Sequence, residues 1–194
     1  MTRDDRYAAL AERWAGGIRW PSVTEVIALA GISKLLISVS EQVLAKAGER
    51  GKAVHEWTHV YDLTGERPPD MNPCRGYVDG WARFRDETGF TPELIEEPLA
   101  SNALRFVGTL DRAGTMQQGE RWVFDLKAVA EVAWWTGLQL AGYELLLSNP
   151  HQRAAVQLFP EGRYKLVAFP DREDTHDFLA ALRVCWAIKR HEEE

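Results

Sequence analysis

The hydrophobic period of the chain changes along its length, and this change restricts the fold more than any other feature. Apolar residues at every third or fourth position predict helices, and short turn-bounded segments rich in β-branched and aromatic residues predict strands. The expected helices cover residues 3–15, 41–63 (as one or two helices), 75–87, 131–147 and 173–190. The expected strands cover residues 94–99, 106–115, 121–127, 153–159 and 163–169. This order predicts an α/β fold with a mixed sheet of about five strands flanked by helices.

A further short helix is expected after Pro21, because Ser22 is a suitable N-cap and Glu25 completes a capping box. The chain has 194 residues, which is enough for one sizeable core and short for two domains. It contains no internal repeat, low-complexity tract or linker. We therefore expect a single domain over residues 1–194.

The strands 106–115 and 121–127 are separated by Gln117-Gln118-Gly119, which is typical of a hairpin turn. An antiparallel hairpin with that turn places Asp111 directly opposite Asp125, with both side chains on one face. Lys127 lies two residues beyond Asp125 and therefore shares that face.

Two neighbouring carboxylates destabilise a sheet unless a positive charge lies between them. A divalent metal ion supplies that charge, and hard oxygen ligands suit Mg²⁺ or Mn²⁺. Lys127 beside such an ion could orient or deprotonate a water molecule. The alternative is a solvated surface hairpin in which Lys127 pairs with Asp125. Apolar neighbours favour a buried hairpin, and they are Val107, Leu110, Val123, Phe124 and Leu126.

Gln139 and Tyr143 lie four residues apart on the helix that follows, so they share one face of it. An amide and a phenol at this place could hold a phosphate or an attacking water. On their own, two such residues are more often part of a plain helix surface.

Four motifs along the chain carry a resemblance to a known family. They are Arg50-Gly51-Lys52-Ala53-Val54-His55, Gly108-Thr109-Leu110-Asp111, Asp125-Leu126-Lys127 and Gln139-Leu140-Ala141-Gly142-Tyr143. Each is weak alone, but in this order they resemble the PD-(D/E)XK nuclease superfamily, and more closely its RecB-like exonuclease branch, which includes many phage and prophage proteins. The resemblance implies a restriction-endonuclease-like core over residues 50–190, with residues 1–49 as a helical N-terminal extension.

The resemblance also implies roles for individual residues. The implied metal ligands are His55, Asp111, Asp125 and the backbone carbonyl of Leu126. The implied catalytic residues are Asp111, Asp125 and Lys127, with Gln139 and Tyr143 shaping the surroundings of the phosphate and the water.

The resemblance implies a further acidic contributor on the strand before Asp111. Glu97 is the candidate, and Glu96 is an equally close alternative. Two residues depart from the family pattern, since Leu110 stands in place of the eponymous proline and Asp125 in place of the commoner glutamate.

The implied activity is hydrolysis of DNA phosphodiester bonds by an exonuclease that uses one or two Mg²⁺ or Mn²⁺ ions. The resemblance further implies a role in phage or prophage recombination or repair, together with a partner protein of that process. Cys74 and Cys185 are too few for an iron–sulfur cluster, and no Walker-type ATP motif occurs.

Two other functions remain open at this point. The segment His55-Glu56-Trp57-Thr58-His59 matches the H-E-x-x-H helix of zinc peptidases, in which Glu56 would act as the general base. The extended form of that motif needs glycine and histidine where Asp62 and Gly65 stand. The second alternative is a nuclease fold that binds nucleic acid without cleaving it, and the intact acidic residues and lysine argue against it.

The charge balance bears on how the chain would hold DNA. Lys and Arg number 23 against 29 Asp and Glu, a net charge of −6, which argues against coating nucleic acid by bulk charge. No segment reaches membrane-spanning length and the N-terminus lacks a signal-peptide stretch, so we expect a cytoplasmic protein without a membrane partner. The resemblance implies that it is bacterial or phage-encoded. The candidate DNA contacts are Arg50, Lys52, Arg112, Trp134 and Trp135, of which at most one tryptophan is expected to face the site.

Overall fold

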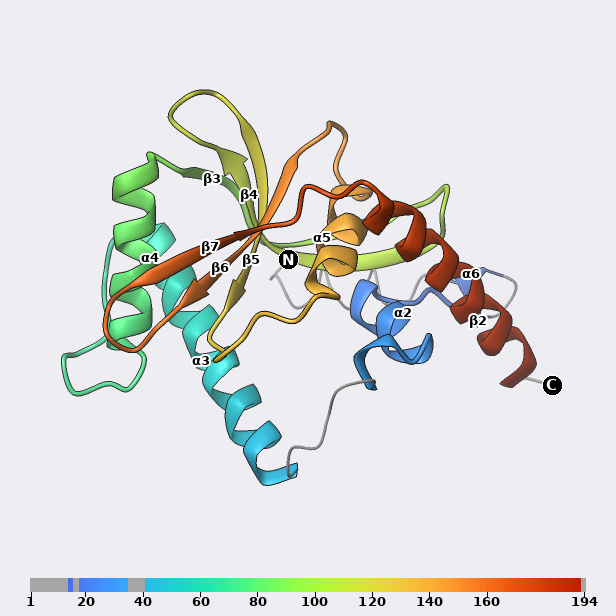
Figure 1. Ribbon diagram of the computed structural model, residues 1–194, viewed down its shortest axis with the longest axis horizontal. Helices are drawn as coiled ribbons and strands as arrows, with labels where there is room; N and C mark the ends of the chain where they lie inside the picture. The colour runs from blue at the N-terminus through green and yellow to red at the C-terminus, as the bar shows by residue number, and fades with distance from the viewer. Residues whose placement is uncertain (1–13, 16–17, 35–40, 193–194) are drawn as a thin grey trace.

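The computed structural model describes residues 14–15, 18–34 and 41–192. At its centre is a five-stranded sheet in the order β3-β4-β5-β6-β7, shown in Figure 1. The β5–β6 pair is parallel and the other three pairs are antiparallel, which confirms the predicted mixed sheet. The strands are β3 (Thr91–Ser101), β4 (Phe106–Thr115), β5 (Arg121–Lys127), β6 (Gln152–Leu158) and β7 (Tyr164–Ala168).

Helices cover both faces of this sheet. In Figure 1, α3 and α4 lie on one side of it, and α2, α5 and α6 lie on the other. The helices are α2 (Val23–Leu29), α3 (Glu41–Thr64), α4 (Arg75–Thr88), α5 (Thr136–Glu144) and α6 (Glu173–Glu192), with a 3₁₀ helix at Ile32–Lys34. A separate small sheet pairs β1 (Trp14–Ala15) with β2 (Ile18–Arg19). None of the described helices is long and apolar enough to cross a membrane.

Two of the expected helices differ from the structure. Residues 3–13 of the first one lie outside the described residues, and its expected end at Trp14 and Ala15 is wrong because these residues form β1. The helix expected from residue 131 begins only at Thr136. The reason is that Gln157 on β6 donates from its Nε2 to the carbonyls of residues 129 and 130, at 2.9 and 2.8 Å. These bonds tie the chain to the end of β6 before the helix begins.

Each face of the sheet has its own apolar core. On the α3/α4 face, the aromatic rings of Trp81, Phe84, Phe90 and Phe124 contact one another. The core of the other face combines residues of α2, β4, α5 and α6, including Val26, Leu110, Leu140 and Phe178.

The N-terminal part of the chain is joined closely to this core. The predicted capping box of α2 is confirmed, because the Ser22 hydroxyl accepts from the Glu25 N–H and the Glu25 carboxylate accepts from the Ser22 N–H. Val107 on β4 donates to the carbonyl of Pro21, so the segment before α2 pairs with the part of β4 that β5 has left. The boundary expected at residue 50 falls inside α3, which runs unbroken through it.

Gly76 on α4 packs against the turn between β6 and β7, where a Cβ atom would lie 1.7 Å from the Pro160 carbonyl oxygen. Gly76→Ala is therefore expected to lower the free energy of unfolding by about 2 kcal/mol, because backbone must shift to admit the methyl group. Gly48→Ala on α3 is the matched control, since its Cβ would meet nothing within 4 Å and alanine favours a helix. Urea unfolding measures both, and an equal effect of the two substitutions would contradict this packing.

Candidate metal centre

β4 and β5 separate from each other at two acidic residues. Their antiparallel ladder has the predicted register and ends at the pair Arg112–Phe124, so Asp111 and Asp125 occupy the next facing positions. Beyond this point the Leu126 N–H donates to Asp111 Oδ2 at 2.7 Å. A carboxylate thus replaces the backbone acceptor that the ladder would have supplied, and it lies between the two strands.

Glu96 on β3 lies next to the same point. The ladder pairs on either side of it are in register, so Glu96 faces Asp111. The φ angle of Glu96 is 48°, in the left-handed region that costs a residue other than glycine about 1–2 kcal/mol. Glu96 is also buried. Backbone strain at a buried acidic residue is a feature of functional sites.

His55 on α3 connects these carboxylates to β5. Its Nδ1 lies 2.9 Å from Glu96 Oε1, and its Nε2 lies 3.2 Å from the Leu126 carbonyl oxygen and 3.7 Å from Asp111 Oδ2. The ligand atoms of His55, Glu96 and Asp111 all lie within 4.8 Å of one another. One imidazole, two carboxylates and a carbonyl oxygen form a donor set that suits a divalent metal ion.

A second chain of polar contacts begins at Asp125. Lys127 Nζ lies 2.8 Å from Asp125 Oδ2 and donates to Gln139 Oε1 at 3.2 Å. Gln139 Nε2 in turn donates to the Tyr143 hydroxyl at 3.0 Å. The structure therefore brings these four residues together, and Gln139 fixes the position of the Lys127 amino group.

The electrostatics of the cluster favour bound positive charge. Burial lowers the pKa of His55, but Asp111, Glu96 and Asp125 outweigh it and raise that pKa to about 9. Burial raises the pKa of Asp111 to about 7, with Asp125 adding to the shift and His55 opposing it. Burial lowers the pKa of Lys127, but Asp125 and Asp111 outweigh it and hold that pKa above its usual value. Buried carboxylates thus attract positive charge to one point, as protons or as a metal ion.

The metal-free protein is expected to lose about 2 kcal/mol of stability as the pH rises from 6.5 to 9. The folded pKa of His55 lies above its ordinary value of 6.5, so the stabilisation is complete below 6.5 and is lost as the pH passes through the folded value. The raised pKa of Asp111 acts in the same direction from 3.8 to about 7. Urea unfolding in EDTA measures the slope, and His55→Gln should flatten it above pH 7. A stability that rises with pH would contradict the charge arrangement.

Arg112 is fully buried, so the expectation that it contacts DNA is wrong. Its guanidinium donates to Asp62 on α3 and to Glu96, and it lies over the Trp81 ring at 5.7 Å from the centroid. Arg112 therefore holds Glu96 beside His55 and balances the buried acidic charge.

A pocket of about 800 Å³ opens beside the metal-ligand residues. His55 and Lys127 line it, together with the exposed Lys52 of α3. Arg50 is tied to the loop after β5, because its Nε donates to the Ala128 carbonyl at 3.1 Å. Among the residues that the sequence predicts to contact DNA, Lys52 is therefore the one that lines this pocket.

The remaining candidates are divided between the centre and its surroundings. Trp134 is 51% exposed, whereas Trp135 is partly buried against the apolar core. The sequence offered two acidic candidates on β3. Glu96 belongs to the group of three possible metal ligands, and Glu97 does not. His59 is not part of that group, so the described residues supply the H-E-x-x-H motif with no third zinc ligand.

Two buried polar residues near the centre were not predicted from the sequence to belong to it. Asp62 lies two helical turns after His55, and this spacing is the signal that it shares a face of α3 with the histidine. Gln157 is 4% exposed, and the signal is a single amide within the apolar strand 154–158. Both residues position the chain around the centre through hydrogen bonds.

Comparisons with known proteins give the following findings. A scan against models of protein families finds no match, and a search of curated proteins finds none either. A crystal structure of an alkaline exonuclease (LHK-Exo) from Laribacter hongkongensis is similar with a TM-score of 0.49 and 11% identity, covering 97% of this chain and 93% of that chain. The structure of LHK-Exo in complex with dAMP is similar with a TM-score of 0.48 and 12% identity, with coverage of 97% and 93%.

Proposed function

We propose that this chain is a divalent-metal-dependent nuclease that hydrolyses phosphodiester bonds of DNA. The observation that carries the proposal is the convergence of His55, Glu96 and Asp111 at one point, where His55 and Asp111 also contact the backbone of Leu126 on β5. Asp125 and Lys127 follow on the same strand, as they do in the sequence motifs of the PD-(D/E)XK superfamily. Buried carboxylates beside a lysine suit phosphoryl chemistry, because a bound cation and an ammonium group can together stabilise the negative charge of a phosphate.

The residues of the chain would share the reaction as follows. His55, Glu96, Asp111 and the Leu126 carbonyl would hold the metal ion, with Asp125 beside them. Bound there, Mg²⁺ or Mn²⁺ supplies Lewis-acid polarisation of the phosphate and lowers the pKa of a water molecule.

Lys127 would orient the attacking water and the phosphate as a charged ammonium group, because nearby carboxylates hold its pKa above the usual value. Gln139 fixes the direction of the Lys127 amino group by accepting from its Nζ. Tyr143 supports Gln139 in turn. The pKa of Tyr143 is raised well above its ordinary value, chiefly by burial, so the phenol stays neutral.

The order of the four sequence motifs resembles that of RecB-like exonucleases, which supports exonuclease action on DNA. The same resemblance supports a role in phage or prophage recombination or repair beside a partner protein. The exposed Lys52 and Trp134 are the residues available to contact a bound strand near the centre.

The test uses end-labelled linear and circular DNA, single- and double-stranded, with Mg²⁺, Mn²⁺ or EDTA. We expect metal-dependent digestion of linear DNA by wild type and by His59→Ala, and none by Asp125→Ala purified in the same way. Absence of digestion by folded wild type under all these conditions would sink the proposal. Zinc-dependent cleavage of casein that His59→Ala abolishes would favour a peptidase instead, and DNA binding without digestion would favour a non-cleaving module.

A further inference from the structure

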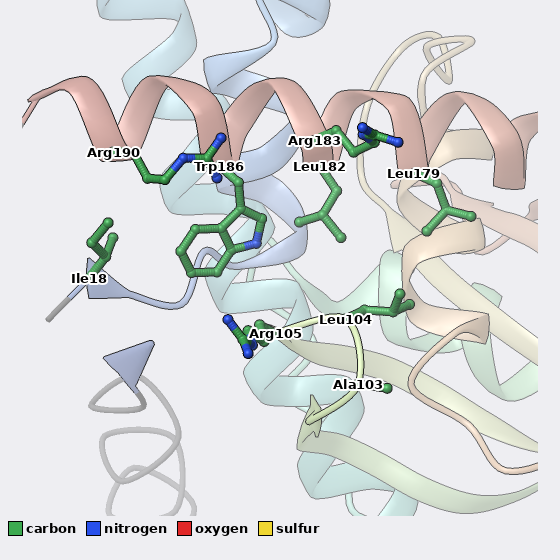
Figure 2. A pocket seen from close by; sticks show the side chains of 9 residues that line it. All are labelled: Ile18, Ala103, Leu104, Arg105, Leu179, Leu182, Arg183, Trp186 and Arg190. Carbon is green, nitrogen blue, oxygen red and sulfur yellow. The ribbon is translucent and has the colours of Figure 1, made fainter. Parts of the chain in front are cut away.

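A second pocket, of about 630 Å³, lies between α6 and the loop that joins β3 to β4. Figure 2 shows α6 above this pocket and the loop with Ala103 and Leu104 below it. Leu104, Leu179 and Leu182 give it apolar walls. Arg105 at its edge immediately precedes β4 and lies six residues before Asp111, so the Cα atoms of these two residues are roughly 20 Å apart.

Three arginines surround the pocket, and they are Arg105, Arg183 and Arg190. All three are exposed, and among the residues that the structure describes none of them forms an ion pair. Two other cations, Arg19 on β2 and Lys189 on α6, differ because both pair with Glu25, at 3.0 and 2.7 Å. In a chain with a net charge of −6, the three arginines form a local excess of positive charge that faces an open pocket.

Trp186 lies within this ring of charge. Figure 2 shows its indole pointing from α6 towards the β3–β4 loop, with the side chains of Arg190 and Arg105 near it. The indole is partly buried against the core, which fixes its orientation while part of its surface remains exposed.

The backbone at Arg105 is strained as well. Its φ angle is 57°, in the left-handed region that glycine adopts without cost, and its N–H donates to the Ser101 carbonyl in a tight turn. A residue other than glycine costs about 1–2 kcal/mol there. Strained backbone of this kind clusters at binding sites, and here it places the Arg105 side chain at the edge of the pocket.

We propose that this pocket binds a segment of single-stranded DNA at a distance from the cleaved bond, with Trp186 stacking a base and the three arginines binding phosphates. Stacking on an aromatic ring within a positively charged groove is the general mode of sequence-independent single-strand binding. Arg183 and Arg190 lie seven residues apart on α6, which is about 10 Å along one helix face, so they would contact different phosphates. An acidic peptide would use the same charges but gains less from a flat indole surface.

This inference rests on the proposed function, and its test is independent of cleavage. A fluorescein-labelled oligothymidylate of about 16 nucleotides is titrated in EDTA over a series of salt concentrations, with fluorescence anisotropy as the readout. Trp186→Leu is expected to weaken binding about tenfold. The double variant Arg183→Ala/Arg190→Ala should weaken it and lower the slope of log K against log salt by about 1.4.

The matched control removes the same charge elsewhere. Arg121→Ala/Lys165→Ala replaces two exposed cations of β5 and β7, and it should leave the affinity within about twofold of wild type. Arg183→Lys/Arg190→Lys keeps the charge and should retain the salt slope, which separates lost charge from lost folding. Circular dichroism of each variant confirms that α6 is intact.

The outcomes separate this proposal from the nuclease proposal. Unchanged affinity and salt slope in the α6 variants would overturn the pocket as a DNA site, even if wild type digests DNA. Loss of binding in these variants would support it, even if no metal ion brings about digestion. Binding of an oligoglutamate peptide, with the same dependence on the arginines and no binding of oligothymidylate, would overturn it in favour of a protein partner.

Discussion

Asp111→Asn is expected to lower metal-dependent DNA hydrolysis about 1000-fold while the metal-free protein stays at least as stable as wild type. Asparagine keeps an oxygen that can accept from the Leu126 N–H, but it lacks the charge that holds a divalent ion. Burial raises the pKa of Asp111 to about 7, so its charged form is disfavoured in the fold and a neutral side chain removes that cost. Initial rates at saturating Mg²⁺ and urea unfolding in EDTA measure the two effects separately.

Neighbouring acidic residues on β3 supply the controls for this prediction. Glu97→Gln removes a carboxylate outside the ligand group and should leave hydrolysis near the wild-type rate. Glu96→Gln changes a member of the group and should raise the Mg²⁺ concentration needed for activity about 10- to 100-fold. Mg²⁺ should also raise the melting temperature of wild type and not that of Asp111→Asn. A loss in Glu97→Gln as large as in Asp111→Asn would show that the ligands are wrongly assigned.

Arg112→Met is expected to lower the free energy of unfolding by about 3–5 kcal/mol. Methionine has a similar length, but it leaves two buried carboxylates, those of Asp62 and Glu96, without the cation between them. It also removes the donors to the Thr58 hydroxyl and to the Asp111 carbonyl. Urea or thermal unfolding at pH 7 measures the loss.

Arg85→Met is the matched control for Arg112, because Arg85 pairs with the same Asp62 at 2.8 Å. Its side chain is 25% exposed, so solvent can take over part of its role and the loss should be about 1 kcal/mol. In the double variant Arg112→Met/Asp62→Leu the loss should be smaller than the sum of the single losses, because both charges leave together. A loss below about 1 kcal/mol in Arg112→Met would mean that the network does not hold the fold together.

Local chemistry was sufficient to predict the hairpin at the centre of the molecule. Its strands at 106–115 and 121–127 agree with the structure residue for residue, because a glycine turn and flanking strand-forming residues act over short distances. The same register placed Asp111 next to Asp125, and the structure shows the ladder ending there. The residues from His55 to Tyr143 that the motifs singled out lie around this point.

The structure differs from the sequence-based predictions where contacts between residues far apart in the chain determine the local structure. Arg112 resembled a surface cation because its partner Asp62 lies 50 residues earlier in the chain. Glu96 and Glu97 could not be separated because the left-handed backbone at Glu96 interrupts the alternation of the strand. The start of α5 depends on Gln157, which belongs to a strand formed later in the chain. Local propensity contains none of these contacts.

The parallel pairing of β5 with β6 has a consequence for biosynthesis. β5 gains its second neighbour only after the chain has crossed over through α5 and returned as Gln152–Leu158. A growing chain on the ribosome therefore contains Asp125 and Lys127 well before anything holds β5 in place from that side. If the chain cuts DNA as proposed, a chain that stops before Gln152 is expected to be inactive, because β5 then lacks its neighbour on that side.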